Sequence, residues 1–173
     1  MSSVRRKSVP DIIASNLNVL FCGINPGLYS AAVGHNFARP GNRFWPALFG
    51  AGFTDSLLSA SEERKLLNYG YGIINIVDRP TASASELGKE ELQAGAKKVI
   101  KKILKYRPQY LAVVGIGAYR TAFKHPHATI GLQNEKIGDT LVWVLPNPSG
   151  LNAHHQLPDL IRSFEKLREA ASR

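Results

Sequence analysis

Four short apolar runs constrain the fold of this chain more than any other feature of its sequence. They are rich in Val, Ile and Leu and cover residues 18–22, 72–77, 110–115 and 140–145. Continuous apolar runs of this length are typical of strands that are buried on both faces of a parallel sheet. The sequence therefore predicts a central sheet of about four strands.

Longer segments with helical periodicity separate and follow these runs. They cover residues 42–51, 61–69, 86–106, 117–123 and 157–171. Alternating strands and helices predict an α/β fold, a three-layer α/β/α sandwich with a mainly parallel central sheet. Residues 128–136 are predicted to form a loop that includes a candidate edge strand.

The length of the chain predicts a single domain that covers residues 1–173. The absence of an internal repeat and of a Pro- or Gly-rich linker agrees with this prediction. The basic segment 1–10 is expected to be flexible. The single cysteine, Cys22, ends an apolar run and is expected to be buried, and one cysteine cannot form an internal disulfide. This cysteine usage favours an intracellular protein, in the cytoplasm or nucleoid if it is bacterial. No apolar stretch has the length of a membrane span.

The charge balance favours a polyanionic partner. Twenty-two Lys and Arg against thirteen Asp and Glu give a net charge of +9 and a pI of about 9.9. Nucleic acid is the partner that such a balance indicates first. The lysines of segment 97–105 do not locate this partner, because they are better explained as one solvated helix face.

Two Asn-Pro loops follow predicted strands at matching places, one at residues 23–27 and one at residues 146–151. Ligands of open α/β sheets bind at the carboxyl ends of the strands, so the two loops are expected to form two walls of one cleft. Taken alone, the loop 23–27 is better explained as a simple turn. The carboxamide of Asn25 can orient a water molecule, but it does not ionise near neutral pH and is no strong general base.

The segment after the first loop, residues 30–45, combines small residues, aromatic rings and two arginines. These are the parts of a pocket for a flat ligand. The ring of Phe37 could stack on a nucleobase, an interaction worth roughly 1–3 kcal/mol per base. Phe44 and Trp45 are better explained as core anchors of the helix that follows.

Four motifs in order carry a specific resemblance. They are residues 23–27 (GINPG), 41–45 (GNRFW), 75–81 (NIVDRPT) and 147–151 (NPSGL). Together they resemble the mismatch-specific uracil-DNA glycosylase and thymine-DNA glycosylase family over residues 17–170. The resemblance implies a uracil-DNA glycosylase-like fold and a monomeric DNA glycosylase that flips uracil out of double-stranded DNA and hydrolyses its N-glycosidic bond, leaving an abasic site.

The resemblance also implies a substrate range and a mechanism. G·U mismatches are the favoured substrates, and thymine and other modified pyrimidines are further candidates. No metal ligand and no metal or organic cofactor is expected. No motif places a lysine as a Schiff-base nucleophile, so strand cleavage is not expected.

The resemblance assigns roles to residues of the base pocket. Asn25 matches the asparagine that positions the attacking water, at a place where related uracil-DNA glycosylases carry aspartate, and a neutral amide there predicts slow chemistry. Phe37 matches the ring that stacks on the flipped base, and the backbone near Ile24 and Phe37 contacts the pyrimidine edge. The small side chains of Ser30 and Ala31 leave room for a substituent at the pyrimidine 5-position.

Asn75 occupies a position where thymine-DNA glycosylase has asparagine and the enterobacterial enzyme has lysine. Its carboxamide can pair with uracil or, after rotation, with cytosine. Cytosine is then rejected by its poor leaving-group ability, by a second group that locks the amide, or by its stable pairing with guanine.

The second loop matches the wedge of the family. Gly150, Leu151 and Asn152 enter the gap in the duplex, with Leu151 as the apolar plug. Taken alone, Leu151 is better explained as a helix-capping hydrophobe. The enterobacterial enzyme has arginine where this chain has Ala153, so the strength of product retention stays open.

Other polar residues receive supporting roles. Asn147 is expected to shape the wedge loop and Ser149 to touch phosphate. His154 and His155 are candidates for phosphate contact or solvated loop residues. Asp78 is expected to form a structural ion pair or cap, and Thr81 is a weak pocket candidate.

Two rival functions remain open from the sequence. One is a lesion-binding module that flips bases without hydrolysing them, because Asn25 is uncharged. The other is an enzyme of free nucleotides or phosphates that uses the same glycine turns. The net charge and Leu151 favour the DNA glycosylase over the second rival.

Overall fold

The computed structural model describes residues 8–173, with five strands forming one central sheet. The strands are β1 (Val19–Gly23), β2 (Tyr71–Asn75), β3 (Tyr110–Val114), β4 (Gly131–Ile137) and β5 (Thr140–Leu145). Their order is β2-β1-β3-β5-β4, and every pairing except β4 with β5 is parallel. The predicted α/β/α sandwich with a mainly parallel sheet is confirmed.

The sheet has one strand more than the four core strands predicted. Strand β4 is an edge strand that pairs with β5, and its residues alternate between exposed and partly buried. It therefore lacks the continuous apolar run by which the other four strands were predicted. The candidate edge strand of segment 128–136 lies here.

Helices and short 3₁₀ segments connect the strands. They are α1 (Leu28–Val33), α2 (Phe44–Gly50), η1 (Ala60–Tyr69), η2 (Ala84–Glu86), α3 (Lys89–Tyr106), α4 (Ile116–Ala122) and α5 (Leu157–Ala171). Segment 61–69 forms a 3₁₀ helix, and a capping box between Ser59 and Glu62 begins it. Helix α1 was not predicted, because six residues are too few to show a helical period.

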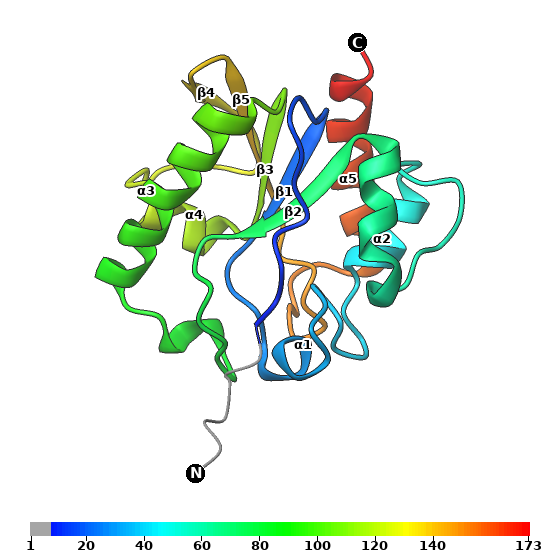
Figure 1. The fold of residues 1–173 in the computed structure, drawn as a ribbon, viewed down its shortest axis with the longest axis horizontal. Helices are drawn as coiled ribbons and strands as arrows, with labels where there is room; N and C mark the ends of the chain where they lie inside the picture. Colours follow the sequence, from blue (N-terminus) through cyan, green and yellow to red (C-terminus); the bar gives the residue numbers. More distant parts are fainter. Residues whose placement is uncertain (1–7) are drawn as a thin grey trace.

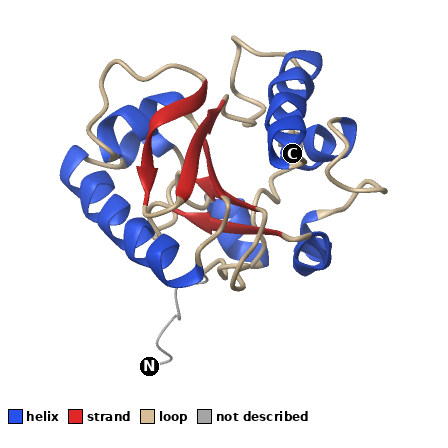
Figure 2. Ribbon diagram, turned by 90° about the horizontal axis from the view of Figure 1, so that it is seen from above, coloured by secondary structure: helices blue, strands red, loops and turns tan. Residues whose placement is uncertain are grey.

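The sheet is covered by helices on both faces, α3 and α4 on one side and α2 and α5 on the other (Figure 1, Figure 2). Phe21, Phe44 and Phe164 lie in the core cluster on the α2 and α5 side. A second cluster, with Cys22 and Val99, fills the α3 and α4 side. Phe44 and Trp45 are both buried, as the sequence predicted.

The N-terminal part of the described chain is tied to the sheet and to a loop. Ile12 exchanges two backbone hydrogen bonds with Ile73, each 2.8 Å long. The carbonyl of Pro10 accepts a hydrogen bond from the Asn36 side chain over 3.1 Å. The segment predicted to be flexible covers residues 1–10, and residues 1–7 of it lie outside the described residues. No helix within residues 8–173 is long and apolar enough to cross a membrane.

Candidate active site

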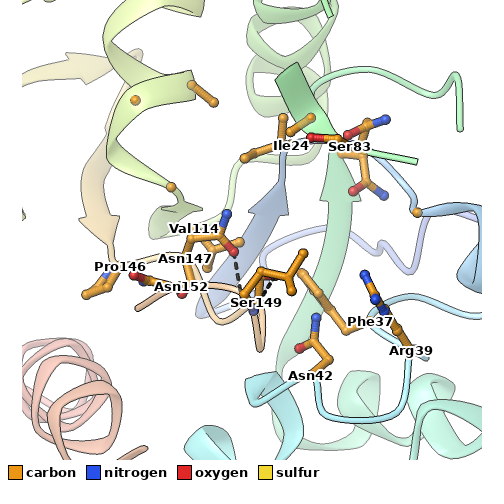
Figure 3. Close-up of a pocket in the computed structure, with 18 of the residues that line it drawn as sticks. Ile24, Phe37, Arg39, Asn42, Ser83, Val114, Pro146, Asn147, Ser149 and Asn152 are labelled. Atoms are coloured by element: carbon orange, nitrogen blue, oxygen red, sulfur yellow. Dashed lines mark hydrogen bonds between the residues drawn. The ribbon is translucent and has the colours of Figure 1, made fainter. Parts of the chain in front are cut away.

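A pocket of about 590 Å³ lies at the carboxyl ends of the parallel strands (Figure 3). The segments after β1, β2, β3 and β5 all contribute to its lining, including residues 24–27, 81–84, 114–118 and 146–147. The chain turns to opposite sides of the sheet after β1 and β3, and this is the place where open α/β sheets bind ligands. Both Asn-Pro loops face this pocket, as predicted.

The side chain of Asn25 is held in one orientation. Its Nδ2 donates to the carbonyl oxygen of Arg79 and to the hydroxyl of Thr81, each over 2.8 Å. The Thr81 hydroxyl itself donates to the carbonyl of Ser83 over 2.8 Å, so it accepts from Asn25. A carbonyl oxygen can only accept, so the amide nitrogen must face these partners and Oδ1 is left as an acceptor.

Phe37 lines the pocket and is held in place by its neighbours. Its ring stacks on Phe44, with ring centroids 4.1 Å apart. Its backbone is left-handed, with φ 52°, a conformation that is unusual for a bulky residue and is found at functional sites. The hydroxyl of Ser30 accepts a hydrogen bond from the backbone of Ala38 over 3.1 Å and supports this turn. Figure 3 shows Phe37 beside Arg39 and Asn42 on one wall of the pocket.

Asn75 is buried at the end of β2, directly beside β1. The parallel register pairs it with Gly23, and a side chain on Gly23 would come within 2.6 Å of Asn75 Oδ1. A side chain at position 23 would therefore displace the Asn75 amide from the orientation seen here. The Asn75 Nδ2 donates to Oδ1 of Asn36 over 3.0 Å, and both residues line the pocket.

The loop after β5 is shaped by its own side chains and carries an exposed leucine. Asn147 Oδ1 accepts from the backbone of Ser149 over 2.9 Å, and Asn152 Nδ2 donates to the carbonyl of Asn147 over 2.9 Å (Figure 3). The Ser149 hydroxyl accepts from the backbone of Leu151 over 3.2 Å. Leu151 is 75 % exposed at the rim of the pocket.

Arg43 anchors this loop from the start of α2. Its guanidinium donates to the carbonyl of Asn152 over 3.2 Å and also to the carbonyls of Ser149 and His155. Its backbone donates to the carbonyl of Pro148 over 2.9 Å. Gly150 passes so close to Gly41 that a side chain on Gly150 would lie 2.8 Å from the Gly41 carbonyl oxygen.

Comparison with known proteins identifies the family of the chain. Residues 10–171 match the profile of the Uracil DNA glycosylase superfamily. The chain belongs to this superfamily. Its fold is similar to that of a candidate uracil DNA glycosylase from Methanosarcina acetivorans, solved by NMR in solution, with a TM-score of 0.61 and 18 % sequence identity over 94 % of this chain and 98 % of the other. Members of the superfamily are DNA glycosylases, which hydrolyse the bond between base and sugar.

Most residues predicted for the glycosylase site line this pocket. They are Ile24, Asn25, Ser30, Phe37, Asn75, Asn147, Ser149, Leu151, Asn152 and His154. Ala31 and Gly150 do not line it. Ala31 follows Ser30 on helix α1, where successive side chains point about 100° apart, and it is buried. Gly150 packs against Gly41 instead.

The pocket has supporting residues that the sequence did not identify as such. Arg43 belonged to a recognised motif, but nothing in the sequence indicated its contacts with a distant loop. The backbone of Arg79 holds Asn25, and the Arg79 side chain pairs with Glu91 at 2.8 Å. Among residues 8–173, Asp78 makes neither the ion pair nor the side-chain cap predicted for it, and the ion pair at this strand end joins Arg79 to Glu91.

Cys22 lies under the pocket and takes no reactive role. It is fully buried, and its Sγ donates to the carbonyl of Gly23 over 3.6 Å. Burial raises the pKa of its thiol well above the ordinary range, so the nucleophilic thiolate does not form near neutral pH. Within the described part of the chain, no three His, Cys, Asp or Glu side chains are grouped to hold a metal ion.

Proposed function

We propose that this protein is a monofunctional DNA glycosylase of the mismatch-specific uracil-DNA and thymine-DNA glycosylase type, which excises uracil and prefers uracil opposite guanine. The observation that carries the proposal is the fixed amide of Asn25. Both of its hydrogens are used by Arg79 and Thr81, and Oδ1 remains to accept a hydrogen bond from a water molecule. This is the arrangement that a water-positioning residue requires.

The flipped base is proposed to lie on Phe37, within the pocket that also contains Asn75. A base must leave the stack before its glycosidic bond can be reached. The Phe44 ring supports one face of Phe37, so the ring is already in place before DNA binds. Backbone N–H groups near Ile24 and Phe37 are proposed to bind the carbonyl edge of the pyrimidine.

The reaction is proposed to begin with cleavage of the bond between N1 of uracil and C1′ of the sugar. The electron pair stays on N1, which is protonated afterwards. The water held by Asn25 then adds to C1′ and loses a proton, which yields an abasic site and free uracil. Asn25 orients this water, but its amide is too weak a base to remove a proton from it. The chemical step is therefore expected to be slow.

Leu151 is proposed to fill the gap that the flipped base leaves in the duplex. A large apolar side chain that is mostly exposed is costly in water and gains from burial between bases. Arg43 and Asn147 hold the loop that carries it. The backbone from Gly150 to Asn152 would face the unpaired guanine, which is the proposed origin of the G·U preference.

A single-turnover assay on duplexes that carry one G·U or one A·U pair tests the proposal. Wild type is expected to release uracil faster from G·U, and strand breaks should appear after alkali and not before it. Asn25→Ala should slow release by about 100-fold or more. A chelator should leave the rate unchanged. Equal rates for wild type and Asn25→Ala would show that the water site is misassigned.

The alternative of a lesion-binding module is separated by the same duplexes. Such a module would bind G·U DNA without releasing uracil at any enzyme concentration. It is kept as the second candidate because Asn25 carries no charge.

A further inference from the structure

Behind the base pocket, a chain of hydrogen bonds connects Asn75 to a buried carboxylate. Asn75 Nδ2 donates to Asn36 Oδ1 over 3.0 Å. Asn36 Nδ2 donates to Glu63 Oε1 and to the carbonyl of Pro10, each over 3.1 Å, and the Asn36 backbone donates to Glu63 Oε2 over 2.9 Å. The roles proposed above for water, base and wedge do not use Asn36 or Glu63.

The orientation of both amides follows from this chain of contacts. The Pro10 carbonyl can only accept, so the nitrogen of the Asn36 amide must face it. Asn36 Oδ1 must then face Asn75, and it can only accept from the Asn75 nitrogen. The Pro10 contact sets this order whether or not Glu63 carries a proton.

Glu63 makes a second set of contacts that fix the Asn36 amide. Its side chain is 2 % exposed and accepts hydrogen bonds from the backbone and the side chain of Asn36, and His35 Nδ1 lies 3.1 Å from Oε2. A buried carboxylate is costly unless such donors satisfy it. Rotation of the Asn36 amide would turn its oxygen toward the Glu63 carboxylate and the Pro10 carbonyl, so three acceptors would meet.

The locked amide leaves one atom of Asn75 for a ligand. Among residues 8–173, the buried side-chain polar atoms that lack a partner are Asn18 Oδ1, Arg43 Nε and Trp45 Nε1. No donor from the same residues reaches Asn75 Oδ1, which is not one of these buried atoms. This oxygen is therefore accessible in the pocket that Asn75 lines, next to Gly23 and the Phe37 ring.

We propose that Asn36, held by Pro10 and Glu63, is a positioning residue that locks Asn75 Oδ1 toward the ring nitrogen N3 of the flipped base. The pocket then accepts pyrimidines that carry a hydrogen on N3, such as uracil and thymine. It rejects cytosine, whose N3 presents a lone pair to the Oδ1 lone pair. This inference rests on the proposed function and names how that site tells uracil from cytosine.

The test compares binding of two bases that differ at N3, in contexts where both are mispaired. Duplexes carry 2′-fluoro-2′-deoxyuridine or 2′-fluoro-2′-deoxycytidine, each opposite thymine, because the fluorine slows cleavage and allows Kd to be measured and the shared opposite base removes any contribution from guanine recognition. Wild type is expected to prefer the uridine duplex by about tenfold or more. Asn36→Ala frees the Asn75 amide, and the preference should fall to about threefold or less.

Two further variants keep the comparison decisive. Glu63→Gln places an NH₂ group against one of the two Asn36 donors. It is expected to weaken the preference for the uridine duplex, as Asn36→Ala does. It therefore tests the inference even if Asn36→Ala fails to fold. Gln93→Ala removes an amide from α3 that bonds to the Thr121 carbonyl, and it should leave the preference unchanged.

The outcomes separate this inference from the proposed function. A wild type that binds both duplexes equally overturns the lock, and so does an unchanged preference in folded Asn36→Ala or Glu63→Gln. Failure of wild type to release uracil from unmodified G·U DNA would instead overturn the proposed function. A general loss of affinity for both duplexes, with the ratio preserved, would show that Asn36 supports the fold and does not set base choice.

Discussion

The amide of Asn25 and the hydroxyl of Thr81 are joined by a hydrogen bond of 2.8 Å between loops that follow two different strands. The two loops run side by side, since the Thr81 backbone also donates to the Pro26 carbonyl over 3.2 Å. The loop after β2, which carries Arg79 and Thr81, thus determines which way the Asn25 amide faces. The proposed water site belongs to this pair and not to Asn25 alone.

Thr81→Val should slow base release without weakening DNA binding. Valine keeps the shape of threonine but removes one of the two acceptors of the Asn25 amide. Loss of one such hydrogen bond is worth about 1 kcal/mol, so the single-turnover rate should fall about fivefold. Thr121→Val on α4 is the matched control. An unchanged rate in Thr81→Val would mean that the Arg79 carbonyl suffices to orient Asn25.

Arg43→Lys should loosen the wedge loop. Lysine keeps the charge but cannot reproduce the planar fork that contacts several loop carbonyls at once. Hydrogen bonds to charged groups contribute about 1.5–3 kcal/mol each, so the Kd for abasic-site DNA should rise at least about tenfold. Arg64→Lys, on the exposed side of η1, controls for the exchange itself. Wild-type affinity in Arg43→Lys would separate the anchor from DNA binding.

Leu151→Ala should weaken DNA binding while leaving the folded protein as stable as wild type. The side chain is mostly exposed without DNA, so its removal costs little in the free protein. Burial of a leucine contributes about 1.5–3 kcal/mol, and abasic-site DNA should therefore bind at least about tenfold more weakly. Leu104→Ala on α3 removes a leucine that is also exposed. Equal losses in the two variants would contradict the wedge assignment.

Cys22 should resist alkylation until the protein unfolds. Its thiol is fully buried, and burial raises its pKa, so both access and thiolate formation are suppressed. Iodoacetamide at neutral pH should modify it in guanidinium chloride and leave it intact in buffer, as judged by mass spectrometry. Rapid labelling in buffer would show that the sheet opens near the pocket.

Glu63→Gln should change how stability depends on pH. Burial raises the pKa of Glu63, although hydrogen bonds from Asn36 and the nearby His35 oppose this shift. The stability that this carboxyl contributes is therefore fully present below its unfolded pKa of about 4.3 and declines as pH rises through the folded value. The Tm of Glu63→Gln relative to wild type should increase from about pH 4 to about pH 7. A Tm difference that is independent of pH would contradict the raised pKa.

The strands buried on both faces were predictable, because their apolar runs are local properties of the sequence. The runs near Val19, Ile73, Leu111 and Val142 all lie in observed strands. Strand β4 offered no such run, since it is an edge strand with alternating exposure. Helix α1 was too short to leave a period, and the 3₁₀ geometry of η1 depends on contacts that the pattern does not encode.

The sequence by itself determined the fold class. It also indicated that Asn25, Phe37, Asn75 and Leu151 lie around one pocket, because each is close to a strand end or a turn. Only the tertiary structure decided how these side chains are oriented. Asn25 and Thr81 are 56 residues apart, Asn36 and Glu63 are 27 apart, and Arg43 and Asn152 are 109 apart. Hydrogen-bond direction depends on atoms that meet after folding, and local patterns carry no record of which distant donor will face which acceptor.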